Sequence, residues 1–415
     1  MRRRTLVVIA LCVVLVAGGV AAFLLVHRLH QIADVRGSST VDFRTAQGPA
    51  PLQPLDVQWP MYGFQAARTR AVGYSVDPPF RTLWQFHAGS LVEFPPSIGY
   101  GRLYLATNSG KVLAVNEQTG KRAWKYVSGR CVAASPAVGP HGQVYAVFLN
   151  KGPPCNRAAG SPGLDGEVIM FGAGFGNIRW RRTIGPSESS PVQIGKLVVV
   201  GDWNGDVWAF QRGTGQLTWR FHTGGSVKGG VAYRDKRFYV GSYDGSVYCL
   251  SLDGKLIWRS AGQGSLFGGG RFYSTPAVRY GRVYIGSTDG KVYSFGAATG
   301  KLRWSRSTGG YVYASPAVAG GLVFIGSYSH RFYALDAATG VPRWTFTANG
   351  PISGSPTVVG RIVYFATLTG RTYGLDIRTG KQVWTFPDGE YSPVVAVPGR
   401  FFLVGQGTIY GMVPR

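Results

Sequence analysis

The chain has few of the residues from which catalytic and metal sites are commonly built. It holds six histidines and four cysteines among 415 residues, and the histidines show no zinc-type spacing. It contains no Gly-x-Ser-x-Gly elbow and no phosphate-binding loop. Gly172, Gly174 and Gly176 superficially resemble a nucleotide motif, but no helical pattern follows them, so they are interpreted as turn glycines. These absences exclude the familiar signatures of zinc, serine-nucleophile and nucleotide-binding enzymes.

Acidic residues are also scarce. The chain has 19 Asp and Glu against 44 Lys and Arg, which gives a formal net charge of +25. The basic residues are spread along the chain without a cluster that would mark a nucleic-acid groove, so we expect no specific nucleic-acid partner. A general arginine bias explains the charge. The alternative is an electrostatic receptor for anionic polymer or lipid, whose binding would fall steeply with added salt.

The N-terminus carries one long apolar run. Residues 5–26 lack charged side chains and follow Arg2, Arg3 and Arg4. A run of this length crosses the hydrocarbon layer as a helix, and the arginines before it favour an N-terminus inside the cell. Because residues 23–26 keep the run apolar beyond the alanines, we favour an uncleaved anchor over a cleaved signal peptide. The sequence therefore predicts a cytoplasmic stub at residues 1–4 and a transmembrane anchor at residues 5–26.

Eight tryptophans recur along the rest of the chain at spacings of 40, 56, 39, 39, 46, 40 and 40 residues. They are Trp84, Trp124, Trp180, Trp219, Trp258, Trp304, Trp344 and Trp384. Each repeat contains short apolar or aromatic runs separated by turns such as Asp-Gly and Thr-Gly, the pattern of four antiparallel strands. Such a unit cannot bury its own apolar faces. We therefore predict an all-β fold, an eight-bladed β-propeller over residues 79–415.

The two ends of the repeat are incomplete in complementary ways. Residues 80–86 form a tryptophan-bearing strand with no blade before it, and the last repeat lacks this strand. We expect residues 80–86 to pair with the last blade, because closure removes the exposed sheet edges of an open array. Residues 27–78 are predicted to be an extracytoplasmic linker. Trp59, Met61, Tyr62 and Phe64 are too apolar for a solvated tether, so part of this linker should pack on the propeller.

Repeats such as residues 336–344 and 376–384, with Thr-Gly four residues before Trp, resemble the tryptophan-docking repeat of the pyrroloquinoline-quinone (PQQ) type propeller family. The resemblance implies that the eight tryptophans dock neighbouring blades and bind no ligand. The family contains quinoprotein dehydrogenases and cofactor-free binding propellers such as the outer-membrane-assembly (BamB-like) lipoprotein scaffold. The dehydrogenases are expected to carry adjacent cysteines, which this chain lacks. We therefore favour a binding module without cofactor over an enzyme, with a PQQ- or metal-dependent oxidoreductase as the alternative.

Two of the cysteines fall in one corner of the second blade. Cys131 begins its innermost strand, and Cys155 lies in the long insertion of residues 149–166. In an oxidising exterior these two residues are predicted to form a disulfide. Cys249 is predicted to be a small buried hydrophobic residue.

One register of the repeat gathers most of the glutamates. When the innermost strands are aligned on their proline, with Val231 in its place in the fourth blade, one residue per blade stands three positions earlier. These are Glu93, Ala133, Glu188, Lys228, Tyr273, Tyr313, Ser353 and Glu390. Three of the chain's five glutamates are among them, and Asp388 stands two residues before the last. The sequence therefore predicts an acidic channel mouth in a basic protein.

The predicted ligand-binding residues of this mouth are Glu93, Glu188, Lys228, Tyr273, Tyr313, Asp388 and Glu390. Converging carboxylates suit a hard cation such as Ca²⁺ or a cationic ligand group, and Glu93, Glu188 and Glu390 would be the metal ligands. The alternative is that these glutamates bond channel water or pair with Lys228 and Arg271.

The insertions at residues 149–166 and 261–271 fall on the same face as this mouth. The chain termini of the propeller fall on the opposite face, so we expect the mouth to point away from the membrane anchor. The sequence as a whole predicts a single-pass membrane protein whose extracytoplasmic propeller binds a protein, peptide or glycan of the cell envelope.

Overall fold

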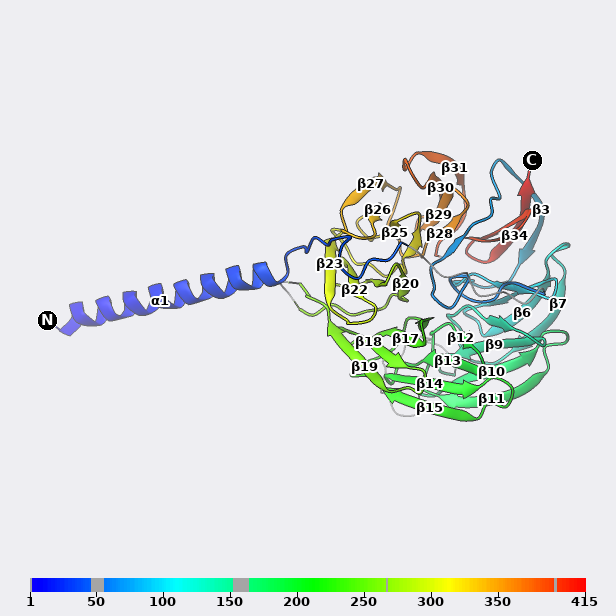
Figure 1. Ribbon diagram of the computed structural model, residues 1–415, viewed down its shortest axis with the longest axis horizontal. Coiled ribbons are helices and arrows are strands. Elements are labelled where there is room, and N and C mark those ends of the chain that lie inside the picture. Colours follow the sequence, from blue (N-terminus) through cyan, green and yellow to red (C-terminus); the bar gives the residue numbers. More distant parts are fainter. Residues whose placement is uncertain (1, 46–55, 152–163, 266–267, 392–393) are drawn as a thin grey trace.

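Eight antiparallel sheets stand around a central axis and form the body of the protein (Figure 1). The computed structural model describes residues 2–45, 56–151, 164–265, 268–391 and 394–415. Each sheet is one blade, whose four main strands are called A to D from the axis to the rim. The B–C turns and D–A connections form one face, called the mouth face, and the A–B and C–D turns form the opposite face. The predicted eight-bladed all-β propeller is confirmed.

The strands of blades one to four are β4 (Ser97–Gly99), β5 (Arg102–Ala106), β6 (Lys111–Asn116) and β7 (Arg122–Val127); β8 (Ala137–Gly139), β9 (Gln143–Phe148), β10 (Gly166–Gly172) and β11 (Ile178–Ile184); β12 (Val192–Ile194), β13 (Leu197–Gly201), β14 (Asp206–Gln211) and β15 (Leu217–His222); β16 (Ala232–Arg234), β17 (Arg237–Gly241), β18 (Ser246–Ser251) and β19 (Leu256–Ala261). The strands of blades five to eight are β20 (Ala277–Arg279), β21 (Arg282–Gly286), β22 (Lys291–Gly296) and β23 (Leu302–Ser307); β24 (Ala317–Ala319), β25 (Leu322–Gly326), β26 (Arg331–Asp336) and β27 (Pro342–Thr347); β28 (Thr357–Val359), β29 (Ile362–Thr367), β30 (Arg371–Asp376) and β31 (Gln382–Phe386); and β32 (Val394–Val397), β33 (Arg400–Val404), β34 (Thr408–Pro414) and β3 (Phe80–His87).

The position of a strand in its blade explains its sequence. The B strand β21 is buried along its whole length, because neighbouring blades cover both faces of its sheet. The D strand β27 at the rim alternates between exposed and partly buried residues. Blade eight combines the two ends of the repeat, because β3 pairs antiparallel with β34 from Phe80 opposite Pro414 to His87 opposite Thr408.

The tryptophans of the repeat lie between blades. Seven of them donate their indole N–H to a carbonyl in the C–D turn of the next blade, as Trp304 does to Ala337 at 2.9 Å. A glycine of that turn lies against the ring; a Cβ on Gly340 would stand 2.7 Å from the Trp304 ring. This glycine also has a positive φ of 73°. The glycine of the C–D turn in blades one to seven therefore makes room for the tryptophan of the blade before it.

Residues 56–76, called the axial segment, fill the axis at its opposite-face end. The segment adds β1 (Val57–Trp59) to β4 of blade one and β2 (Ala71–Val72) to β28 of blade seven. Between these strands its carbonyls accept hydrogen bonds from the middle residues of the A strands of blades two, four, five, six and seven. The donors are Val138, Tyr233, Val278, Val318 and Val358. Trp59, Met61 and Tyr62, predicted to pack on the propeller, are each no more than 6% exposed.

The helix α1 (Arg2–Gln31) extends away from the ring beside β22 and β23 (Figure 1). It continues five residues beyond the predicted end at residue 26, and Val13–Gln31 is long and apolar enough to cross a membrane. The end of the helix is held by the insertion at residues 261–271: Gln263 Nε2 donates to the carbonyls of Gln31 at 2.9 Å and Ala33 at 3.0 Å. This insertion belongs to the mouth face.

The expectation that the mouth face points away from the anchor is therefore wrong at the point where the helix attaches. Residues 32–45, called the strap, run along the outside of blades five and six from the mouth face to the opposite face. Asp34 accepts a hydrogen bond from the Ser307 backbone at 2.8 Å, and Asp42 pairs with Arg303 further along. The prediction considered only where the repeat begins and ends, and a segment outside the repeat crosses the rim.

Candidate functional site

A small cavity lies on the axis at the mouth face. It is lined by Tyr62, Glu93, Phe94, Glu188, Ser190, Lys228, Gly229, Gly230, Tyr273, Thr275, Tyr313, Ser315, Ser353, Gly354, Ser355 and Tyr391. Five of the predicted ligand-binding residues, Glu93, Glu188, Lys228, Tyr273 and Tyr313, are therefore brought together. The cavity volume is about 40 Å³, room for a few water molecules or the tip of one side chain.

The floor of the cavity closes it toward the opposite face. Hydroxyls of the A strands accept hydrogen bonds from the backbone of the blade before them, as Ser355 does from Ser315 at 2.8 Å and Ser315 from Thr275 at 2.9 Å. Tyr62 of the axial segment reaches this ring of hydroxyls, with its own hydroxyl 2.9 Å from that of Ser355. Among the described residues, the cavity is therefore a cup that is closed toward the opposite face and faces the mouth face.

Glu188 is the most strongly bonded carboxylate of the cup. Its oxygens accept hydrogen bonds from the Trp203 indole N–H at 2.9 Å and from the Tyr273 hydroxyl at 3.1 Å. Lys228 Nζ lies 3.3 Å from the same carboxylate and 3.9 Å from the centre of a Trp203 ring. The sequence left two possibilities for these glutamates, metal binding or pairing with a basic residue. Glu188 is paired with Lys228.

Tyrosine rings form a continuous arc along one side of the cup. Tyr273 contacts Tyr313 edge-on at 5.3 Å between ring centres, and Tyr313 contacts Tyr328 at 5.1 Å. Tyr243 extends the arc at one end and Tyr311 at the other. Burial and the nearby Glu188 raise the pKa of Tyr273 well above its usual value, so this hydroxyl stays protonated and acts as a donor.

Glu93 faces this arrangement and forms no ion pair with any residue that the structure describes. Burial raises the pKa of Glu93 to about 7, and the negative charge of Glu188 adds to the rise. Asn108 and the charge of Lys228 act on this pKa in the other direction. The cup therefore contains two carboxylates and one ammonium group.

Two of the predicted residues lie elsewhere. Glu390 lines a neighbouring hollow with His87, Leu91, Gln406 and other residues at the junction of blades eight and one. Asp388 accepts hydrogen bonds from the Tyr410 hydroxyl and the Gly389 backbone, both at 2.7 Å, and so stabilises its own turn. No group of three His, Cys, Asp or Glu side chains able to hold a metal occurs within the described ranges. The three-glutamate metal site is not assembled there.

The sequence analysis did not identify the residues of the B–C turns that pack around the lining of the cup. Trp203, Tyr243 and Tyr328 each stand immediately after the residue that follows a B strand, and Asn108 occupies the same register in blade one. This register can be seen in the sequence when the B–C turns are aligned on the end of the B strand. It lies outside the A-strand register that predicts the mouth, so the A strands alone predict only part of the aromatic side of the cup.

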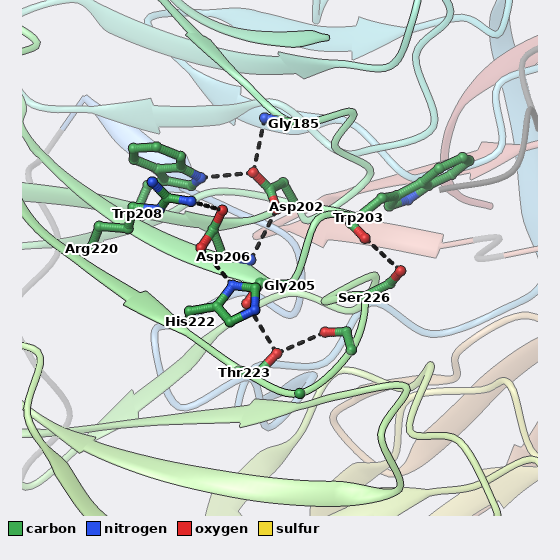
Figure 2. Close-up of polar contacts among 12 residues, drawn as sticks. Gly185, Asp202, Trp203, Gly205, Asp206, Trp208, Arg220, His222, Thr223 and Ser226 are labelled. Carbon is green, nitrogen blue, oxygen red and sulfur yellow. Dashed lines mark hydrogen bonds and ion pairs between the residues drawn. The ribbon is translucent and has the colours of Figure 1, made fainter. Parts of the chain in front are cut away.

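Figure 2 shows how blade three fixes the turn that carries Trp203. Asp202 replaces the serine or threonine of most blades, and it accepts hydrogen bonds from the Gly185 backbone and the Trp208 indole, both at 2.8 Å. Burial raises the pKa of Asp202. The Trp203 carbonyl accepts a hydrogen bond from the Ser226 hydroxyl at 2.6 Å. The turn is therefore held on both sides of the indole that bonds Glu188.

Cys131 is disulfide-bonded, and Cys249 is a free, buried cysteine. Cys155, the predicted partner of Cys131, lies outside the described residues together with most of the 149–166 insertion. The pairing of these two cysteines stays a prediction.

The cup does not fit the cofactor that the dehydrogenases of the PQQ type use. PQQ is a polycyclic quinone with several carboxylates, and about 40 Å³ is far below the several hundred Å³ of ordinary cofactor sites. Glu93 and Glu188 would repel its carboxylates, and Lys228 is already paired with Glu188.

The comparisons with known proteins agree with the fold. The family model described as outer membrane protein assembly factor BamB matches residues 81–220, 203–312 and 289–411. A BamB protein of Burkholderia pseudomallei is 31% identical over 129 residues, which is 30% of this chain and 32% of that protein. A tetrathionate hydrolase of Acidithiobacillus ferrooxidans is 25% identical over 197 residues, 43% of this chain and 38% of that protein. The chain thus spans only about a third of the length of these curated relatives.

Solved structures resemble this one at low sequence identity. The crystal structure of BamB from Moraxella catarrhalis has a TM-score of 0.65 and 16% identity, covering 81% of this chain and 98% of that chain. The quinohemoprotein alcohol dehydrogenase of Comamonas testosteroni has a TM-score of 0.70 and 15% identity, covering 86% and 80%. These similarities show the fold alone. The family match extends over well more than half of the sequence and confirms the resemblance seen in the tryptophan repeat: the chain belongs to the PQQ-like propeller family whose model is described as outer membrane protein assembly factor BamB.

Proposed function

We propose that this protein is a membrane-tethered scaffold of the cell envelope that binds a protein partner at the mouth face of its propeller. The observation that carries the proposal is the cup, which opens on one face, is closed below by Tyr62, and has an aromatic side that continues to the surface. Tyr311 at its rim is 55% exposed. Aromatic side chains next to a small desolvated pocket are typical of binding hot spots. The family model and one curated relative are both described as outer membrane protein assembly factor BamB, and this description supports a binding role.

The helix α1 and the strap support the proposal that the propeller is tethered to a membrane. Residues 1–4 would lie inside the cell, residues 5–26 would cross the membrane, and the propeller would lie outside it. Residues 27–78 would not act as a free linker, because the strap and the axial segment hold most of their described part on the propeller. The mouth face would therefore stay at a fixed position relative to the point where the helix leaves the membrane.

Site-specific photo-crosslinking tests the binding face. A p-benzoylphenylalanine residue is placed at position 311 of the full-length protein in its own membrane, and the adducts are identified by mass spectrometry. Phe175 is the matched control, because it is an aromatic residue that is 90% exposed in a C–D turn of the opposite face. We expect a defined protein adduct from position 311 and none from position 175. The same adduct from both positions, or none from position 311, would refute the proposal.

A further inference from the structure

The cup already accommodates a cation. Lys228 Nζ lies 3.9 Å from the centre of a Trp203 ring, 5.3 Å from that of Tyr243 and 6.0 Å from that of Tyr273. An ammonium group over aromatic faces is attracted by the negative charge of the rings, most strongly where water is excluded. The same ammonium group pairs with Glu188 at 3.3 Å. This half of the cup is therefore complete without a ligand.

The other half also has a carboxylate and aromatic rings, and the charge of Lys228 acts on it only at a distance longer than an ion pair. Glu93 lines the cavity with Tyr313 and Tyr391, and among the described residues it forms no ion pair. The nearby basic residue Arg271 is exposed, its guanidinium lies over the Tyr243 ring at 5.5 Å, and it forms no ion pair with Glu93 among the described residues. A partly buried carboxylate beside aromatic rings favours a second positive group, because that group would supply both an ion pair and a cation–π contact.

Size and access limit what this group is. A volume of about 40 Å³ admits the end of one extended side chain and excludes a folded ring system. The floor formed by Tyr62 and Ser355 leaves one entrance, on the mouth face. A partner must therefore insert a protruding tip from that face. The chain has a formal net charge of +25, but the cup carries two carboxylates. A basic side chain at the tip of a partner would therefore be attracted to the cup and repelled by most of the remaining surface.

We propose that the cup receives one lysine or arginine side chain of a protein partner, bound between the carboxylate of Glu93 and the ring of Tyr313. Lys228 of this chain occupies the equivalent position beside Glu188 and Trp203. This inference rests on the proposed function, since it names the chemistry by which the mouth face recognises its partner.

Small probes test the cup directly. Full-length protein in non-ionic detergent at low salt is titrated with Nα-acetyl-lysine methylamide, with Nα-acetyl-norleucine methylamide, which lacks the ammonium group, and with N-acetylglucosamine. Binding is measured by calorimetry or ligand-observed NMR. We expect the lysine probe to bind at least about tenfold more tightly than the norleucine probe, which corresponds to one charge-assisted contact. Equal binding of the two probes, or binding of the sugar alone, would overturn the proposal.

Two variants locate the contact. Glu93→Gln keeps the size and hydrogen-bonding capacity of the side chain and should reduce lysine binding to the norleucine level, and Tyr313→Leu should also weaken it. Glu117→Gln is the matched control, because Glu117 follows β6 in a C–D turn of the opposite face, and it should leave lysine binding unchanged. Unchanged binding in Glu93→Gln would place the cation elsewhere and overturn the proposal. A proteolysis profile like that of the parent protein shows that each variant is folded.

The two proposals fail in different ways. If position 311 crosslinks to a protein but the lysine probe does not bind, the scaffold proposal stands and the basic-tip proposal is wrong. If the lysine probe binds as expected but no protein is crosslinked, the cup recognises cations and the scaffold proposal is wrong.

Discussion

The guanidinium of Arg70 lies 3.6 Å from the centre of the Tyr62 ring, and both residues are buried in the axis of the propeller. Within the described residues, Nε and Nη2 of Arg70 have no hydrogen-bond partner. Burial lowers the pKa of Arg70, and the contact with Tyr62 acts in the other direction. The floor of the cup is thus a tyrosine whose ring supports a buried cation below it and whose hydroxyl bonds the hydroxyl ring above it.

Replacing Tyr62 should therefore destabilise the whole protein. Tyr62→Ala removes a side chain that is 4% exposed and leaves Arg70 without its ring. We expect the free energy of unfolding to fall by about 3–5 kcal/mol, the usual loss for a buried aromatic residue. Urea denaturation followed by circular dichroism measures this change. Tyr311→Ala, at a tyrosine that is 55% exposed, should cost no more than about 0.5 kcal/mol. Similar losses for both variants would contradict a structural role for the axial segment.

The docking of tryptophan against glycine predicts a second difference in stability. Gly340 and Gly321 have positive φ values of 73° and 74°, but a Cβ would stand 2.7 Å from the Trp304 ring at Gly340 and meet nothing within 4 Å at Gly321. Gly321→Ala should cost about 1–2 kcal/mol for the backbone conformation alone. Gly340→Ala should cost a further 1–3 kcal/mol, roughly, because the ring must move. Thermal unfolding of the two variants compares them, and equal melting temperatures would show that the contact does not constrain the turn.

The pKa of Glu93 predicts how stability changes with pH. Because the folded-state pKa of about 7 is above the ordinary value of 4.5, the folded protein binds a proton more strongly than the unfolded chain. This group should therefore make the protein more stable as the pH falls from about 7 to about 4.5, by no more than about 3 kcal/mol. Glu93→Gln should remove this contribution. The test is the difference between the two unfolding free energies across this pH range, and a constant difference would contradict the prediction.

The lining of the cup also predicts the result of a cofactor test. Purified protein incubated with Ca²⁺ and PQQ and then passed through a desalting column should retain no quinone absorbance and should not reduce an artificial electron acceptor with alcohols. The reason is the small volume and the two carboxylates of the cup. A stoichiometric chromophore that is lost in Lys228→Met would show instead that the cup expands to bind the quinone and would favour the oxidoreductase alternative.

The sequence predicted the ring because the tryptophan spacing reflects a contact that recurs at seven of the eight blade junctions. Each of these seven tryptophans packs against a turn glycine in the next blade, so the distance between the two residues varies little except at the two insertions. Residues outside the repeat were harder to place. The apolar character of Trp59 and Tyr62 predicted that this segment packs on the propeller. Its position on the axis could not be predicted, because it is held by backbone N–H groups that every A strand has and that leave no pattern in the sequence.

The candidate site was predicted in part for a similar reason. The register that identified Glu93, Glu188, Lys228, Tyr273 and Tyr313 repeats in every blade, and the structure brings these residues together. The same alignment misplaced Glu390 and Asp388, because the connection between β31 and β32 is shorter than the one before blade one: Glu390 follows Trp384 by six residues, whereas Glu93 follows Trp84 by nine. The aromatic residues of the B–C turns belong to a second register that converges on the same axis only in three dimensions.

The axial segment has a consequence for the order in which the molecule folds. Residues 56–76 leave the ribosome before any blade, yet their partners are strands distributed over the whole ring, and β3 must wait for β34 at the far end of the chain. Contacts between such distant parts of a chain form slowly. The ring must therefore assemble around the axial segment, and the last blade to be synthesised completes the enclosure of residues that emerged before the first blade.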